Sequence, residues 1–387
     1  MISMNRFNRH AVFFGAICFC VVSLFNFQTS SSQEARKYRA KAFWLPPIPK
    51  DEPTRRQSEE TKQESFDVET TIELDRSAWF SQKVKWEKHR PELEQLVKKD
   101  EIVGDVRPLL DFAILGHAKC ATTFISQWLS SHPSIQIWDY EVCDLYDGRP
   151  DKLSRKLYEE LPRGDYQRGF KCPGHFARRS LRYFRRYFSK AHLIVGVRHP
   201  VRWFESYYNF RVRHGNWTMP EPQKLIGECI PEGHGVCTDR ANFHASLSMF
   251  GQTNLSDPSE HHLLRLRDKY ALISQIDNPV FLYDTAQLYD SDEGRKAQFR
   301  RDLADFMGLD DLPDPPVEER KKPKPKAIDV CDPSFDKIRE ELLLIGKRAS
   351  IWIRKYYLES SNAYVSNREF FEETLQTWKE DPCTAKD

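Results

Sequence analysis

The segment Gly116–Thr123 has the residue types of a phosphate-binding loop. It follows the largely apolar run Asp111–Leu115, and a periodic apolar segment over Ala121–Ser131 comes directly after it. A loop between a buried strand and a helix directs backbone N–H groups at an anion, which the helix dipole also favours. The segment therefore predicts a site for a phosphate or sulfate group. An ordinary strand–helix turn with a surface lysine is the alternative.

The lysine of this loop stands early in the turn. In the P-loop of nucleoside-triphosphate enzymes, G-x-x-x-x-G-K-[ST], the lysine is seventh. Here Gly116 is first, Lys119 fourth, Ala121 sixth and Thr123 eighth. A triphosphate needs lysine and Mg²⁺ at its β- and γ-phosphates, whereas an earlier lysine suits a ligand with one 5′-phosphate and a departing group. The spacing disfavours a nucleotide kinase, which stays open as an alternative.

A second anion-binding pattern follows another apolar run, 192–197. Arg198 ends this run, Pro200 opens a predicted helix, and Ser206 lies eight residues after Arg198. An arginine offers a fork of donors and a serine offers a hydroxyl, which together suit a phosphate monoester. The plainer interpretation is an arginine at a strand end and a serine on the surface.

The two patterns together resemble the sulfotransferases that use 3′-phosphoadenylyl sulfate as donor. Gly116–Thr123 is similar to the family's 5′-phosphosulfate loop, approximately K-x-G-T-T or K-G-G-T-R, with Ala121 where the family usually has glycine. Arg198 and Ser206 are similar to its 3′-phosphate element. The added methyl of Ala121 keeps open a catalytically silent glycan-binding protein on the same fold. The donor-binding residues that the resemblance implies are Lys119, Cys120, Ala121, Thr122, Thr123, Arg198 and Ser206.

Residues on the acceptor side resemble the membrane-bound heparan sulfate glucosaminyl 3-O-sulfotransferases. His132–Ile135 and then Glu141 match a stretch in which the glutamate nine residues after the histidine is the catalytic base. Lys171-Cys172-Pro173 is similar to their K-T-P, whose lysine assists at the reaction centre. The resemblance implies Glu141, Lys119 and Lys171 as catalytic residues. The alternatives are His175 as the base and Glu141 as an ordinary solvated acid.

Two further basic segments allow a functional and a plain interpretation. Lys324-Pro325-Lys326 lies where glycan sulfotransferases carry a K-G-R-like loop over the cofactor, so the resemblance implies Lys324 and Lys326 as donor contacts. A solvated Lys/Pro linker is the alternative there. The segment Arg178–Lys190 combines six cations with apolar residues at helical spacing, and indicates either a solvated helix face or a contact with an anionic glycan.

The elements that must position these residues alternate along the chain. Apolar runs predict buried strands, and 3.6-residue periodicity predicts helices. Their alternation indicates an α/β fold, a P-loop NTPase-like parallel sheet flanked by helices. We place the sulfotransferase domain at 106–380. The predicted strands are 111–115, 167–171, 192–197 and 279–283, and the predicted helices are 76–100, 121–131, 295–307, 335–358 and one from Pro200.

The N-terminal residues differ from the rest of the chain. Arg6 and Arg9 precede an apolar run over Ala11–Phe27, about 25 Å long as a helix. We predict a cytoplasmic tail and signal anchor at 1–28 and a flexible stem at 29–105, with a cleaved signal peptide and secretion as the alternative. Glycosylation sequons at Asn216 and Asn254 favour a lumenal domain. The expectation is a single-pass Golgi membrane protein.

Charge and cysteine content limit the partners. A net charge of +2 over 387 residues excludes a chain-wide electrostatic nucleic-acid binder. No cysteine spacing predicts zinc, because Cys229, His234 and Cys237 lack a fourth ligand. In an oxidising lumen Cys229 and Cys237 are expected to pair. We expect a carbohydrate acceptor, a membrane contact through the anchor, no nucleic acid and no metal, since lysines and backbone dipoles suffice for a charge smaller than a triphosphate's.

Overall fold

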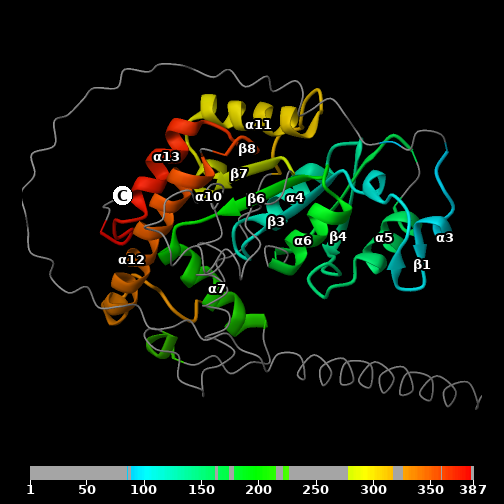
Figure 1. Ribbon diagram of the computed structural model, residues 1–387. Coiled ribbons are helices and arrows are strands. Elements are labelled where there is room, and N and C mark those ends of the chain that lie inside the picture. The colour runs from blue at the N-terminus through cyan, green and yellow to red at the C-terminus, as the bar shows by residue number, and fades with distance from the viewer. Residues whose placement is uncertain are drawn as a thin grey trace, which may run out of the picture. The chain divides into compact units, whose positions relative to one another are not determined.

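A six-stranded parallel sheet carries the described part of the molecule (Figure 1). The computed structural model describes residues 85, 89–161, 164–173, 178–214, 221–225, 278–316, 326–358 and 360–384, all within the compact unit Ile72–Asp387. The strand order is β4-β5-β3-β6-β7-β8, with every neighbouring pair parallel. The strands are β3 (Phe112–Gly116), β4 (Ile135–Glu141), β5 (Gln167–Lys171), β6 (His192–Val197), β7 (Val280–Asp284) and β8 (Ala363–Val365).

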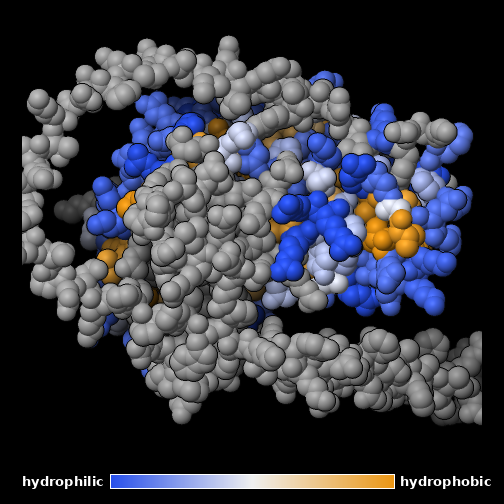
Figure 2. All heavy atoms as spheres, viewed as in Figure 1, coloured by the Kyte–Doolittle hydropathy of each residue, from blue (hydrophilic) through white to orange (hydrophobic). Residues whose placement is uncertain are grey.

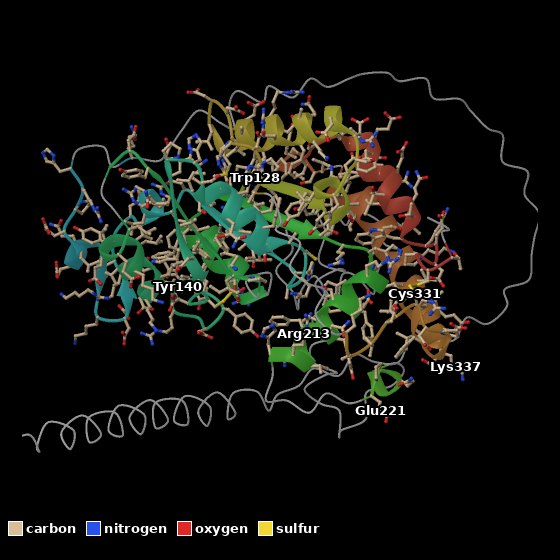
Figure 3. The ribbon with its side chains drawn as sticks, turned by 180° about the vertical axis from the view of Figure 1, so that it is seen from behind. Trp128, Tyr140, Arg213, Glu221, Cys331 and Lys337 are labelled. Atoms are coloured by element: carbon tan, nitrogen blue, oxygen red, sulfur yellow. A yellow bond between two sulfur atoms is a disulfide. The ribbon has the colours of Figure 1, made fainter. Side chains whose placement is uncertain are left out.

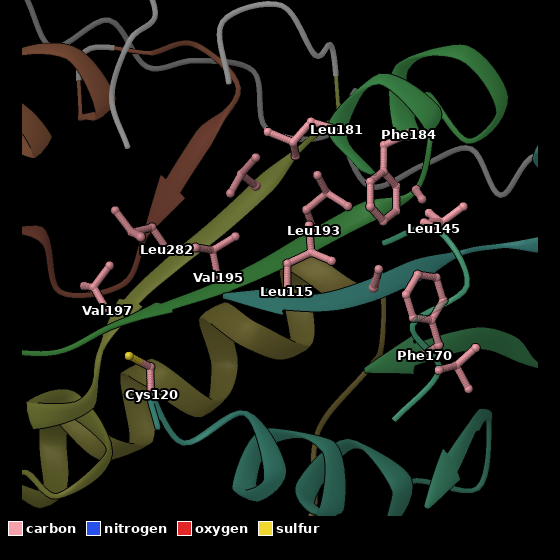
Figure 4. Close-up of a cluster of buried hydrophobic side chains, with 14 of the residues drawn as sticks. Leu115, Cys120, Leu145, Phe170, Leu181, Phe184, Leu193, Val195, Val197 and Leu282 are labelled. Atoms are coloured by element: carbon pink, nitrogen blue, oxygen red, sulfur yellow. The ribbon is translucent and has the colours of Figure 1, made fainter. Parts of the chain in front are cut away.

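Helices cover both faces of this sheet. One face packs on α4 (Thr122–Ser130) and α11 (Glu293–Met307), through side chains such as Trp128 and Phe299. The other face packs on a second set of helices, and Figure 4 shows part of that core, with Leu115 and Leu193 beside Phe184. Burial on both faces explains why the central strands are continuous apolar runs. The second set is α5 (Pro150–Glu159), α6 (Arg178–Tyr187), α7 (Pro200–His214), α12 (Asp336–Trp352) and α13 (Arg368–Thr377).

The remaining elements are short. A helical turn, α10 (Thr285–Leu288), follows β7, and a π-helical turn over Ile353–Tyr357 continues α12. Before the sheet, α3 (Leu93–Leu96) leads into a two-stranded hairpin, β1 (Val97–Lys98) and β2 (Glu101–Ile102).

The predicted α/β fold with a parallel sheet is confirmed, and the four predicted strands lie within one residue of β3, β5, β6 and β7. The predicted helix over 76–100 is wrong in its described part. Leu93, Leu96 and Val97 bury their side chains within a single turn, and the polar residues that follow offer a further helical turn nothing to bury. Lys99 instead takes a positive φ of 54° and turns the chain into the hairpin.

The apolar stripe of Arg178–Lys190 faces the core on α6, as the plain interpretation of this segment expects. Leu181, Phe184 and Phe188 are fully buried in the core, whereas Arg182 and Arg185 are exposed. In Figure 2 hydrophilic side chains cover the position of α6. Contact of these arginines with a glycan stays a prediction.

Several expectations lie outside the described residues. They are the anchor at 1–28, most of the stem, both sequons, His175, Lys324 and the Cys229–Cys237 pair. Within the described ranges, no helix has both the length and the apolarity to cross a bilayer.

Candidate active site

The loop between β3 and α4 has an unusual backbone. Gly116 has a φ of 115°, and Lys119 and Ala121 have φ values of 70° and 58°. Ala121 is the residue that caps the N-terminus of α4, in the left-handed conformation. That conformation costs a residue with a side chain about 1–2 kcal/mol. A glycine at this position would avoid this cost. Contacts around the loop must therefore maintain its shape.

A glycine of β6 lets the loop approach the sheet closely. Gly196 lies opposite Gly116 in the β3–β6 register. A Cβ atom added to Gly196 would lie 2.6 Å from the carbonyl oxygen of Cys120 and 2.5 Å from the ring of Tyr283. The loop backbone can occupy this position because residue 196 has no side chain.

Side-chain donors hold the carbonyl groups of the loop. The Tyr283 hydroxyl donates to the Cys120 carbonyl over 2.7 Å, and the Trp203 indole N–H donates to the Ala118 carbonyl over 2.8 Å. The Arg198 guanidinium donates to the Lys119 carbonyl over 3.3 Å. The protein itself thus provides donors for these carbonyls. The first-turn amide N–H groups of α4 have no acceptor within the helix backbone, so they can donate to a ligand.

Three cations, Lys119, Arg198 and Arg213, lie near one another at this loop. The Lys119 ammonium lies 4.4 Å from the centre of the Phe210 ring. Burial lowers the pKa of Lys119, and the nearby charges of Arg213 and Arg198 lower it further. Among the described residues, no carboxylate forms an ion pair with any of the three. Such a cluster favours a bound anion, which would relieve the mutual repulsion.

An acid and a lysine meet at the ends of β4 and β5. Glu141 lies opposite Lys171 in the strand register. The Lys171 ammonium is 3.5 Å from Oε1 of Glu141 and donates to the Thr123 hydroxyl over 3.1 Å. The side chain of Lys171 is only 6% exposed, whereas that of Glu141 is 52% exposed. Lys171 therefore links the loop to an acid that an external molecule can reach.

The helix α7 carries a further row of site residues. Ser206, Phe210 and Arg213 are spaced at i, i+4 and i+7 and so share one helical face. Because Phe210 contacts Lys119, this face lies along the loop. Arg213 ends the row near the C-terminal end of α7 (Figure 3).

Lys326 lies against α7 rather than free in solution. Its ammonium is 2.8 Å from Oε1 of Glu205, the neighbour of Ser206. The backbone N–H groups of Ala327 and Ile328 both donate to the Asn209 side-chain oxygen. The segment that begins at Lys326 is thus docked beside the predicted 3′-phosphate residues.

Burial shifts the pKa values of two titratable groups of the loop away from the neutral range. Burial lowers the pKa of His117 to about 3, which keeps the imidazole neutral. Burial raises the pKa of the Cys120 thiol, and Figure 4 shows this side chain at the core cluster. Cys120 therefore contributes its backbone to the site.

The structure thus brings together the predicted residues Lys119, Thr123, Glu141, Lys171 and Arg198. Sequence reasoning missed Tyr283, Trp203, Phe210, Arg213 and the disulfide Cys143–Cys172. The seven-residue step from Ser206 to Arg213 on a predicted helix was a usable signal. The others depend on tertiary contacts that spacing does not encode.

Comparison with solved structures gives 16 matching chains. No protein-family model and no curated protein sequence matches the chain. A solved sulfotransferase from Alicyclobacillus acidocaldarius is similar over 64% of this chain and 96% of its own, with 16% identity and a TM-score of 0.44. A similarity of this size carries no argument about activity, so the functional conclusion rests on the residues of the site.

Proposed function

We propose that this chain is a sulfotransferase. It would transfer a sulfuryl group from 3′-phosphoadenylyl sulfate to a hydroxyl or amine of a carbohydrate acceptor in the secretory pathway. One observation carries the proposal. Lys171 contacts both the loop residue Thr123 and the accessible acid Glu141, so donor-binding and proton-accepting groups are linked through one ammonium.

The donor would bind along the loop and α7. The first-turn amides of α4 and the hydroxyls of Thr122 and Thr123 suit the 5′-phosphosulfate. Arg198 and Ser206 suit the 3′-phosphate, with Lys326 beside them. The three cations near the loop match the charge of a phosphosulfate, and the proposal requires no metal.

The proposed reaction is an in-line displacement at sulfur. Glu141 accepts the proton of the acceptor hydroxyl while the acceptor oxygen attacks the sulfur atom. The bond between sulfur and the bridging phosphate oxygen breaks, and adenosine 3′,5′-bisphosphate leaves. Lys119, Lys171 and the loop amides stabilise the charge that develops on the bridging and sulfuryl oxygens.

The compartment belongs to the proposal as well. Cys143–Cys172 and Cys331–Cys383 form disulfides in the described part of the chain. Structural disulfides are typical of oxidising compartments. Together with the apolar N-terminal run and the two sequons, they support a Golgi membrane protein with a lumenal catalytic domain.

The test is a transfer assay with the full chain. The protein is incubated with sulfur-labelled 3′-phosphoadenylyl sulfate and a panel of neutral, carboxylated and sulfated glycans, with Lys119→Ala as the inactive control and Lys337→Ala, an exposed lysine of α12, as the matched one. We expect label in at least one glycan, and its loss in Lys119→Ala only. Phosphoryl transfer from ATP with Mg²⁺, or donor binding without any transfer, would reject the proposal.

A further inference from the structure

A disulfide closes the sheet at the place where Glu141 and Lys171 lie. Cys143 and Cys172 are bonded, with their Cα atoms 5.4 Å apart. Cys172 directly follows Lys171, and Cys143 stands two residues after Glu141. The link therefore flanks both members of the acid–lysine pair.

The backbone at Glu141 has few other attachments. Among the described strands β4 stands at the edge of the sheet, so one side of it pairs with no other described strand. Its pairing with β5 is interrupted by an irregularity between Ile137 and Glu141, and such irregularities bend a strand and disrupt its ladder. Pairing resumes at Glu141 with Lys171, and Val142 donates to the Lys171 carbonyl over 3.0 Å.

The other half of the disulfide is firmly anchored. Cys172 is 1% exposed, and its backbone N–H donates to the carbonyl of Ile114 over 3.1 Å. Ile114 belongs to the central strand β3, which leads into the donor loop. A path of one backbone hydrogen bond and one disulfide thus runs from the central strand β3, through Cys172 and Cys143, to the edge strand that carries Glu141.

We propose that the Cys143–Cys172 disulfide is a positioning element for the Glu141–Lys171 pair, so that turnover depends on its oxidation state. The inference rests on the proposed function. A dithiol would supply two electrons and two protons. The sulfur–sulfur bond breaks, two thiols form, and the dithiol closes to its own disulfide. Cys143 is half-buried, which leaves its side of the bond open to such a reductant, whereas Cys172 is buried.

Loss of the link should affect catalysis and donor binding differently. The donor loop is held by hydrogen bonds that Tyr283, Trp203 and Arg198 donate to its carbonyl groups, and the disulfide takes no part in these three bonds. The donor affinity should therefore stay the same. The Glu141 carboxylate, by contrast, would lose the constraint that keeps it at Lys171, and small misplacement of a catalytic group costs about 10²-fold or less in rate.

The test compares two disulfide removals in the full chain. Cys143→Ala/Cys172→Ala removes the proposed positioning link, and Cys331→Ala/Cys383→Ala removes the other described disulfide as the matched control. Kcat, donor affinity and Tm are measured for each, well below the lower Tm. We expect the first variant to lose about tenfold or more in kcat with donor affinity within about twofold, and the control to lose Tm with kcat retained.

A second, reversible experiment on the wild-type protein tests the inference even if the double variant does not fold. Wild-type protein is treated with dithiothreitol, assayed, reoxidised and assayed again, with the reduced pair located by thiol labelling. We expect kcat to fall with reduction of Cys143–Cys172 and to recover on reoxidation. Unchanged kcat in this arm or in the variant, or equal kcat losses in both disulfide variants, would overturn the inference. Absence of transfer by the untreated wild type would instead reject the proposed function.

Discussion

The loop Gly116–Thr123, which we propose as the donor-binding loop, follows β3 in the middle of the sheet, whereas Glu141 ends β4 at its edge. Around the loop, buried side chains from β7 and α7 bind one backbone carbonyl after another. Around Glu141, the strand is irregular, the side chain is half exposed, and one disulfide supplies the covalent hold.

This difference indicates a division of labour. A site enclosed by fixed donors suits a ligand that is the same in every reaction, such as a shared sulfuryl donor. A more open edge with a reachable acid suits a variable acceptor. Changes near the loop should thus alter donor binding, and changes near β4 should alter turnover.

The largest effect should come from the open side. Glu141→Gln keeps the size of the side chain and removes the proton-accepting charge. We expect kcat to fall about 10²–10⁴-fold, the range typical of general-base loss, with unchanged donor affinity. Initial rates and calorimetric donor titrations measure the two quantities. Asp139→Asn, a neighbouring acid on the same strand, is the control, and near-native turnover in Glu141→Gln would show that another group is the base.

On the enclosed side, Tyr283→Phe removes one hydrogen bond to the loop. The buried Cys120 carbonyl would lose its donor, at a cost of about 1–3 kcal/mol. We expect about tenfold weaker donor binding and a smaller change in kcat once the donor saturates. The control is Tyr289→Phe, because Tyr289 is an exposed tyrosine directly after the helical turn α10. Unaltered donor affinity would mean that the loop keeps its shape without Tyr283.

A buried acid at the end of β7 should make stability depend on pH. Burial raises the pKa of Asp284 from 3.8 to about 6. The folded state therefore holds this proton more tightly than the unfolded state, so ionisation opposes folding. The protonated Asp284 carboxyl therefore contributes stability that is fully present below about pH 4 and is lost as the pH rises through about 6.

Asp284→Asn should remove that dependence, because an asparagine can also accept the capping hydrogen bond from Ala286. We expect the variant to gain about 2–3 kcal/mol relative to wild type between pH 4 and 7. Urea unfolding at several pH values measures the difference. Parallel pH curves for the two proteins would refute the assignment.

The smallest effect should come from Ala121. A glycine there relieves the left-handed backbone strain and adds freedom to the unfolded chain, for a net gain of about 0.5–1 kcal/mol. Ala118→Gly is the matched control, since Ala118 has no positive φ and should lose stability. Chemical denaturation compares them. A destabilised Ala121→Gly would show that the methyl group is needed at the loop.

The central strands and the edge strands differ in how well the sequence predicts them. The central strands β3, β6 and β7 are continuous apolar runs, because helices cover both their faces, and the sequence predicts them to within one residue. The edge strand β4 reads IQIWDYE, with polar residues that blur both periodicities, and it was missed. The three-residue strand β8 is too short to leave a pattern.

Site residues divide in a similar way. Lys119, Arg198 and Ser206 stand at fixed distances from strand ends, so their spacing carries the signal. Tyr283 reaches the loop across Gly196, a contact that exists only once β6 and β7 are side by side. Disulfide pairing also depends on the tertiary fold, since the cysteines at 143 and 172 are 29 residues apart.

We propose that the loop and α7 bind a nucleotide with one 5′-phosphate and a 3′-phosphate, without a metal. Calorimetric titration of the full chain with adenosine 3′,5′-bisphosphate in the presence of EDTA tests it most directly, alongside adenosine 5′-phosphate and ATP with Mg²⁺. We expect the bisphosphate to bind about tenfold or more tighter than either competitor, because a charge-assisted contact is worth about 1.5–3 kcal/mol. Tighter binding of ATP with Mg²⁺, or equal binding without the 3′-phosphate, would contradict it.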